Sequence, residues 1–272
     1  MMDFRIALRT EVLLFDGATG TMLQEKGLTP DQCPELWNIT YPEKIKQLHA
    51  AYKNAGAKIL ETNTFGGNRI KLKKFNLAHR LVEMNQSAVR LAKEVMGTDG
   101  WVAASVGPTG EFLQPFGSLT FDELYDVYKE QITVLAQAGA DIILIETMID
   151  LTEARIALLA AKETCSLPII CSFTFEPNGR TLMGNDPVAV VQTIQSLGAS
   201  AVGINCSGGP EEVLPVLKKM KKYSKIPIIV QPNAGIPKIV EGKTVFPFSP
   251  EEMADKMAPV LEEGANAIGG CC

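Results

Sequence analysis

One pattern recurs four times along this sequence, and it constrains the fold more than any other feature. Each copy begins with a Gly-Ala pair, typical of the end of a helix, and continues into an apolar segment of strand length. The four copies are AGAKILETNTF, AGADIILIETM, LGASAVGINCS and EGANAIGGCC. The sequence therefore predicts a repeated helix-to-strand unit whose strands end in polar or sulfur-containing residues at matching positions.

Eight apolar runs of strand length alternate with segments of helical character. They are continuously apolar, as expected of parallel strands buried on both faces. The runs cover residues 12–15, 58–61, 101–106, 141–145, 168–173, 201–204, 227–230 and 266–268. Thr120, Asp150 and Ser249 each precede an acid by three positions, which indicates three helix N-termini. Eight such units predict an α/β fold of the (β/α)8 TIM-barrel class.

An open doubly wound sheet is the alternative arrangement of these units. That fold places a glycine-rich phosphate turn after its first strand. The turn here, Asp16 to Gly20, lacks the G-x-G-x-x-G spacing. We therefore prefer the barrel and expect a single domain over residues 1–272, with the closing helix after strand eight absent from this chain.

Charge and composition exclude several classes of function. The formal net charge of −5 argues against a large nucleic-acid-binding face. Asp3, Arg5 and Arg9 make the first ten residues too charged for the apolar core of a signal peptide. The longest uncharged run, residues 187–210, is interrupted by Gln, Asn and Gly and does not suit a membrane span. We expect a cytoplasmic protein that binds neither nucleic acid nor membrane.

The repeat aligns three of the six cysteines. Counted from the glycine of each copy, the seventh residues are Asn63, Glu146, Asn205 and Cys271, and the eighth are Thr64, Thr147, Cys206 and Cys272. Alternate strands of a barrel contribute side chains to the same layer, so these thiols are predicted to meet at the carboxyl-end mouth. Gly269-Gly270 lets the backbone leave strand geometry, so that Cys271 and Cys272 can both turn inward. Three thiols with a fourth position open indicate a catalytic zinc site.

The residues alone leave other interpretations of these thiols open. Cys271 and Cys272 could form a vicinal redox pair, which would make the chain a dithiol redox protein. Alternatively, a fourth protein ligand could close the zinc site of a structural or binding barrel. Cys33, Cys165 and Cys171 are interpreted as structural, because free cysteine is among the residue types most often buried.

Polar residues at other strand ends complete the predicted site. Asp16 and Glu146 end strands one and four, where two carboxylates can receive an ammonium group or perform acid–base chemistry. Gly17 offers a backbone amide close to a bound ligand. Asn233, after strand seven, is either a carbonyl-oxygen ligand of the metal or a turn residue. Asn63 is added as a substrate-binding candidate at the matching repeat position.

The chain resembles the homocysteine S-methyltransferase family over essentially its whole length, through LLFDGATGTMLQ, ETNTFGGNR, SVGPTGE, IETM, GINCSGGPEE, VQPNAG and AIGGCC. It is most similar to the homocysteine-binding module of the cobalamin-dependent methionine synthases. The resemblance implies a (β/α)8 barrel that transfers a methyl group to the thiol of L-homocysteine, giving methionine. It also implies site residues: Cys206, Cys271 and Cys272 as zinc ligands, Asp16 and Glu146 at the substrate amino group, and backbone near Gly17 and Ala18 at its carboxylate.

The resemblance also bears on the mechanism and the methyl donor. The betaine-using branch has a tyrosine where this chain has Gly66, so Asn233 becomes the candidate fourth zinc ligand in the absence of substrate. A zinc-bound thiolate is the expected nucleophile, and no general base is required at the methyl group. The favoured donor is methylcobalamin on a partner domain or protein, not bound by this chain alone. S-methylmethionine and betaine are the alternatives.

Overall fold

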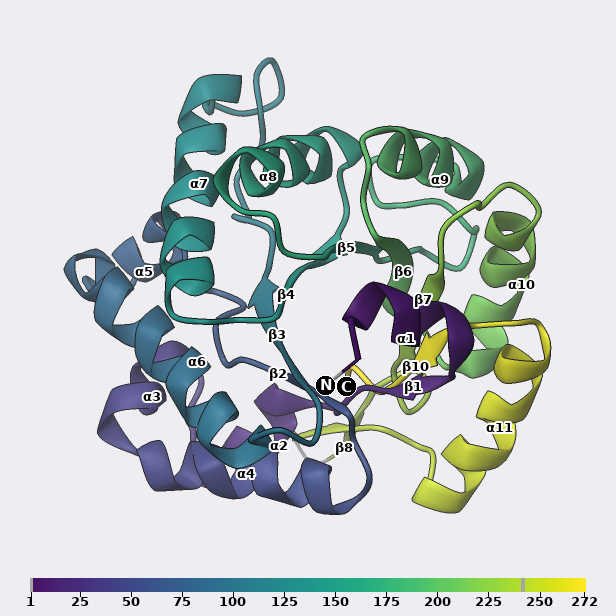
Figure 1. The fold of residues 1–272 in the computed structure, drawn as a ribbon, viewed down its shortest axis with the longest axis horizontal. Helices are drawn as coiled ribbons and strands as arrows, with labels where there is room; N and C mark the ends of the chain where they lie inside the picture. The colour runs from purple at the N-terminus through teal and green to yellow at the C-terminus, as the bar shows by residue number, and fades with distance from the viewer. Residues whose placement is uncertain (1, 241–242) are drawn as a thin grey trace.

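The computed structural model describes residues 2–240 and 243–272, and it confirms the predicted parallel barrel. Its eight strands pair in the order β1-β10-β7-β6-β5-β4-β3-β2 and form the central ring of Figure 1. A bridge between Phe15 and Ile59 joins the first strand to the second and closes the ring. The strands are β1 Leu13–Leu14, β2 Ile59–Glu61, β3 Trp101–Val106, β4 Ile142–Met148, β5 Ile169–Phe173, β6 Ala201–Cys206, β7 Ile228–Pro232 and β10 Ala267–Ile268.

Helices follow the strands along the chain and surround the ring (Figure 1). The α-helices are α1 Phe4–Thr10, α2 Thr19–Glu25, α3 Trp37–Thr40, α4 Pro42–Asn54, α5 Arg69–Lys73, α6 Leu81–Met96, α7 Phe121–Gln137, α8 Leu151–Thr164, α9 Pro187–Ser196, α10 Pro210–Lys221 and α11 Pro250–Glu262. Two 3-10 helices, η1 Pro34–Leu36 and η2 Ala78–Arg80, lie in the connections. None of the described helices combines the length and the apolar character that crossing a membrane would require.

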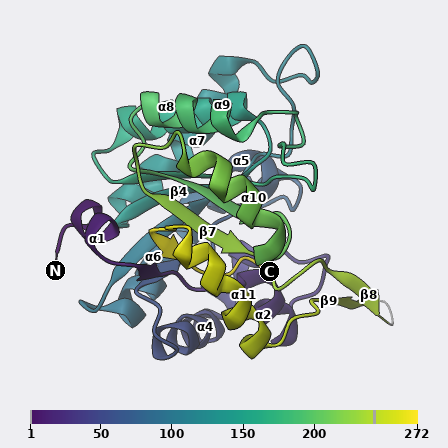
Figure 2. The same cartoon turned by 90° about the vertical axis from the view of Figure 1, so that its right-hand side faces the viewer.

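Most of the apolar runs are buried on both sides, which explains why they do not alternate with polar residues, whereas Val12 and Leu14 of the first run are exposed. One cluster fills the inside of the ring with inward-facing strand residues such as Ile59, Ala103 and Ile229. Phe4 of α1 belongs to the same cluster and packs edge-on against Trp101, with ring centroids 5.6 Å apart. Helix α1 therefore plugs one end of the barrel, opposite the end where the chain terminates (Figure 2).

Two features of the chain differ from the sequence-based expectation. β4, β6 and β7 extend beyond the predicted ends at residues 145, 204 and 230, because Glu146, Asn205 and Gln231 interrupt the apolar runs inside the strands. A separate antiparallel hairpin, β8 Lys238–Val240 and β9 Lys243–Val245, was not predicted. It projects at the same end of the barrel as the C-terminus (Figure 2).

Of the three predicted helix starts, two have the expected capping box and one does not. Thr120 and Ser249 exchange hydrogen bonds with acids three residues later, as predicted. Asp150 caps α8, but Glu153 does not return a bond to it. The buried Glu153 carboxylate instead accepts hydrogen bonds from the Thr109 amide at 2.8 Å, the Thr109 hydroxyl at 2.7 Å and the Tyr128 hydroxyl at 2.7 Å. Glu153 therefore anchors the β3–α7 connection.

Candidate metal and substrate site

A cavity of about 410 Å³ lies at the carboxyl ends of the barrel strands. Its wall carries three thiols and three carboxyl groups, from Cys206, Cys271, Cys272, Glu35, Glu61 and Glu146. No lysine, arginine or histidine belongs to the part of this wall that the structure describes. A ligand that brings positive charge would therefore stabilise the ionised forms of these groups, because buried anions without a cationic partner are costly.

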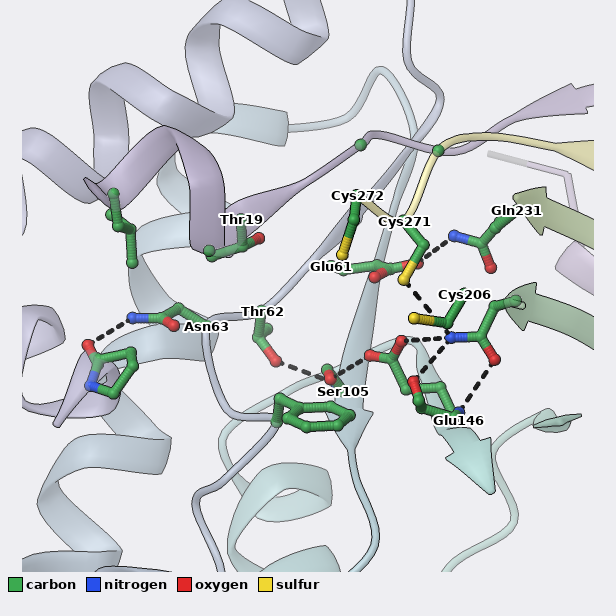
Figure 3. Close-up of a pocket in the computed structure, with 18 of the residues that line it drawn as sticks. Thr19, Glu61, Thr62, Asn63, Ser105, Glu146, Cys206, Gln231, Cys271 and Cys272 are labelled. Carbon is green, nitrogen blue, oxygen red and sulfur yellow. Dashed lines mark hydrogen bonds between the residues drawn. The ribbon is translucent and has the colours of Figure 1, made fainter. Parts of the chain in front are cut away.

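The three thiols that the repeat aligned lie together. The sulfur atoms of Cys206, Cys271 and Cys272 are within 4.8 Å of one another and converge in Figure 3. Cys206 ends β6 with a left-handed backbone, φ 62°, which turns its side chain away from the regular strand direction. The segment after β10 is pinned by the Cys271 amide donating to Pro232 O at 3.0 Å and the Ala234 amide donating to Cys272 O at 2.7 Å.

Hydrogen bonds among the three thiols favour the negatively charged thiolate form of Cys206. The Cys271 and Cys272 thiols donate to Cys206 and lower its pKa to about 3. The same bonds raise the pKa of Cys271, and that of Cys272 to about 11. The soft donor set suits a thiophilic divalent metal, whose binding would displace the remaining protons. Tetrahedral zinc with bonds of about 2.3 Å needs sulfur atoms about 3.8 Å apart. This separation is compatible with the 4.8 Å within which the three sulfur atoms lie.

Asn233 lies next to this cluster. Its side chain hydrogen-bonds Cys206, and its amide nitrogen also donates to Ser207 O at 3.5 Å. Its Oδ1 atom is buried and has no hydrogen-bond partner among the described residues. A buried acceptor without a donor is a plausible ligand for a cation, so the donor set fits a metal with three sulfurs and one oxygen.

Glu146 lines the cavity, and Asp16 is buried close enough to it that the charge of Glu146 adds to the effect of burial in raising the pKa of Asp16. The Ser105 hydroxyl donates to Glu146, and burial raises the pKa of this carboxyl to about 7. Asp16 Oδ2 accepts the Glu61 amide at 2.9 Å, whereas its Oδ1 is buried and unpaired in the described part of the chain. Burial also raises the pKa of Asp16 well above its usual range. Both carboxyl groups would gain from a bound cation.

The sequence analysis missed a third buried carboxyl group, that of Glu61. It ends β2, and its Oε1 accepts a hydrogen bond from Gln231 Nε2 at 2.6 Å (Figure 3). Burial, followed by the charges of Glu146 and Asp16, raises its pKa well above the usual range. Glu61 is the last residue of the predicted second run, so the strand-end argument used for Asp16 and Glu146 also applies to it.

Backbone of the first turn forms another part of the wall. Gly17 lines the cavity, and a Cβ there would lie 2.9 Å from the Tyr52 ring, so a side chain at this position would force Tyr52 to move. The Tyr52 hydroxyl donates to Ala18 O at 3.0 Å and fixes this turn before α2. Thr19 and Gly20, at the start of α2, also line the cavity. Amides at a helix start can receive an anionic group.

The structure gives Asn63 a role in the wall itself. Its side-chain nitrogen donates to Pro34 O at 2.8 Å and to Asn38 Oδ1 at 3.1 Å. In return, Asn38 Nδ2 donates to Asn63 O at 2.8 Å. These bonds tie η1 and α3 to the end of β2 and use both hydrogens of the Asn63 amide. Only Oδ1 of this side chain is left for a ligand.

Glu35 was not predicted as a site residue, and its position explains why residue 66 is a glycine. Glu35 Oε1 accepts the Gly66 amide at 2.6 Å and would lie 2.7 Å from a Cβ at that position. Glu35 is buried and lines the cavity. Residue 66 can therefore carry no side chain while Glu35 keeps this place. No pattern in the sequence marks Glu35, because it lies in an irregular connection.

Comparison with known proteins identifies relatives along the whole chain. Residues 13–272 match the sequence model of the family described as homocysteine S-methyltransferase. The chain is 32% identical over 288 aligned positions to methionine synthase of Mycobacterium tuberculosis, and 33% identical to that of Mycobacterium leprae. Each alignment covers 99% of this chain and 24% of the relative, so the chain spans about a quarter of their length.

Solved structures share the fold. The homocysteine methyltransferase MmuM from Escherichia coli superposes in its oxidized form with a TM-score of 0.82 at 23% identity, covering 100% of this chain and 95% of that one. Its metallated form gives the same TM-score at 22% identity. These similarities support the (β/α)8 architecture.

The raised pKa of Glu146 predicts how the stability of the metal-free protein depends on pH. Folded Glu146 holds its proton up to about pH 7, whereas the usual pKa is 4.5. The unfolded chain loses that proton earlier, so the free energy of unfolding should fall as pH rises through this window and level off above it. This group contributes up to about 3 kcal/mol of the fall. Urea unfolding of chelator-treated protein at pH 5 and pH 7.5 measures it.

The matched variant for this measurement is Glu146→Gln, which cannot titrate at this position. Asp16 and Glu61 shift stability in the same direction, so the variant should retain part of the fall and lose the share of Glu146. Equal falls in the wild type and the variant would show that Glu146 has an ordinary pKa in the folded protein.

Proposed function

The chain belongs to the homocysteine S-methyltransferase family, and from that premise we propose that its cavity binds L-homocysteine and presents the substrate thiol for methylation, giving methionine. The observation that carries the proposal is the convergence of three thiols beside buried carboxyl groups in a cavity whose described lining includes no cationic side chain. Homocysteine brings a sulfur atom for the thiol side and an ammonium group for the carboxyl side.

Cys206, Cys271 and Cys272 would hold zinc, and Asn233 Oδ1 would complete the set in the absence of substrate. Bound there, zinc would lower the pKa of a coordinated substrate thiol so that it is a thiolate at neutral pH. The contribution of the chain is to hold three sulfurs at one place and to leave room beside them. The pinned segment after β10 supplies that rigidity.

Asp16 and Glu146 would receive the substrate ammonium group. Both carboxyl groups are desolvated, so their charged forms are stabilised when a cation lies against them. Backbone amides near Gly17 and Ala18 would bind the substrate carboxylate. These contacts fix the amino-acid end of homocysteine and aim its sulfur at the thiols. The methyl group transfers without moving any of its protons, so no side chain need act as a base there.

We further propose methylcobalamin, carried by a partner domain or protein, as the methyl donor. Support comes from the relatives, which are methionine synthases about four times as long as this chain. The proposal also agrees with Gly66, where Glu35 leaves no space for the tyrosine that the betaine-using branch has at this position.

The proposed reaction predicts methionine formation from L-homocysteine and methylcobalamin by the zinc-loaded chain. Parallel assays with S-methylmethionine and betaine should give little product. A Cys271→Ser chain, which lacks one metal ligand, is the control for uncatalysed transfer. Methionine from S-methylmethionine or betaine alone would reassign the donor, and its absence with every donor would contradict the proposed activity.

Metal content gives a second prediction. The purified chain should carry about one zinc, and Cys206→Ser should lose most of it because three protein ligands are the minimum of a catalytic zinc site. Cys165→Ser is the matched control, since this free cysteine is half-buried and lies outside the cluster. Elemental analysis of the three proteins measures the difference. Wild-type zinc in Cys206→Ser would remove this residue from the site.

Substrate recognition gives a third prediction, for Glu146→Gln. Losing one partner of a buried charged contact costs about 2–5 kcal/mol of binding, so homocysteine should bind much more weakly while zinc content stays constant. Turnover at saturating homocysteine should fall far less, because the contact is the same in the ground and transition states. Steady-state kinetics and calorimetry measure both quantities.

The control substrate is 2-mercaptoethanol, a thiol without an amino group. It should be a poor substrate that reacts about equally with the wild type and Glu146→Gln. An equally sharp loss with both thiols would assign Glu146 to metal organisation or to the chemistry, and the amino-group role would be wrong.

A further inference from the structure

A buried asparagine lies between the thiols and the carboxyl groups, and the function proposed above gives it no task. Asn205 precedes Cys206 on β6 and is 1% exposed. Its side chain contacts residues of β4 and β5 and the segment after β10. It is therefore placed to connect the two halves of the cavity.

The hydrogen-bond partners fix which end of the Asn205 amide faces the cavity. Oδ1 accepts the Thr147 backbone amide at 2.9 Å and the Ser172 hydroxyl at 2.8 Å. A backbone N–H can only donate, so the oxygen must lie at this end. The amide nitrogen consequently points toward Thr147 Oγ1 at 2.7 Å, Glu146 Oε2 at 3.3 Å and Cys271 Sγ at 3.8 Å.

Two amide hydrogens therefore serve three acceptors. Thr147 Oγ1, the nearest, takes one of them, and the other lies between the Glu146 carboxyl and the Cys271 sulfur. Hydrogen bonds strengthen with the negative charge of the acceptor, so the two groups compete for this hydrogen. An ammonium group bound against Glu146 stabilises the carboxylate form of this side chain, so substrate binding changes how the hydrogen is divided between the carboxyl group and the sulfur.

Asn205 also holds the backbone that carries Glu146. Thr147 has a left-handed conformation, φ 59°, which is costly for a β-branched residue. It lies where the register between β4 and β5 shifts. The Asn205 amide accepts a hydrogen bond from the backbone N–H of Thr147 and donates one to its hydroxyl. These two bonds fix the irregular strand end and the direction of the neighbouring Glu146.

We propose that Asn205 is a positioning residue that couples recognition of the substrate amino group at Glu146 to the thiol cluster at Cys271. The coupling element is the amide hydrogen that these two groups share. The inference rests on the proposed function for the identity of the ligands. Asn205 itself makes no bond to the reacting atoms and transfers no proton.

The test is Asn205→Asp, which keeps the shape and the acceptor for Thr147 and Ser172 but removes both donated hydrogens. Loss of a group that supports metal ligands typically costs 10–100-fold in metal affinity, so Co²⁺ affinity should fall about 10-fold or more and the thiolate-to-cobalt absorption should change. At saturating zinc, KM for homocysteine should rise about 10-fold or more, with KM for 2-mercaptoethanol nearly unchanged.

Two further variants keep the test interpretable. Asn85→Asp is the matched control, because Asn85 is also 1% exposed but its amide nitrogen donates to Gly67 O and Leu81 O, away from the thiols. It should keep wild-type Co²⁺ affinity and KM. Ser172→Ala covers the case in which Asn205→Asp fails to fold, since it removes one of the bonds that orient Asn205. It should move both quantities in the same direction, by a smaller factor.

The outcomes separate the inference from the proposed function. A loss of thermal stability alone, with Co²⁺ affinity and homocysteine KM as in the wild type, would assign Asn205 a purely structural role and overturn the coupling. A change in only one of the two quantities would also overturn it. Failure of the proposed function appears in the wild type instead, as absence of homocysteine binding, and the coupling then falls with it. The Co²⁺ titration does not depend on methyl transfer.

Discussion

The cavity concentrates acidic groups in a place where water cannot fully solvate their charges, and most of its properties follow from this. Asp16, Glu61 and Glu146 resist ionisation because burial favours their neutral forms. Hydrogen bonds from Cys271 and Cys272 lower the pKa of Cys206, while the pKa values of the two donors are raised. A metal ion beside the thiols and an ammonium group beside the carboxyl groups would stabilise both sets of charges, as the proposed binding of homocysteine requires.

The barrel creates this concentration by bringing strand ends from distant parts of the chain to one mouth. Regular strands would send alternate side chains out of the ring. The backbone departs from that geometry at Thr147, at Cys206 and after Ile268, and each departure turns a functional side chain toward the cavity. Left-handed backbone is costly for residues other than glycine. Hydrogen bonds from neighbouring strands hold these departures in place.

Residues outside the barrel strands shape the opening. Glu153 reaches from α8 to fix the β3–α7 connection, and Asn63 ties η1 against the end of β2. Glu35 fills the space next to Gly66. The hydrogen bonds of all three side chains hold the wall of the cavity. Rigid walls keep the thiols and the carboxyl groups at fixed separations, which is required for reacting groups to be oriented.

The sequence by itself determined the barrel, the grouping of Cys206, Cys271 and Cys272, and the strand-end position of Glu146. Hydrophobic runs and repeat spacing report local backbone geometry, and in a parallel barrel local geometry fixes the height of each side chain. Only the tertiary structure decided the parts played by Glu35, Glu61, Asn205 and Glu153. Their contacts join residues between 31 and 170 positions apart along the chain, and no local pattern encodes which distant side chains meet.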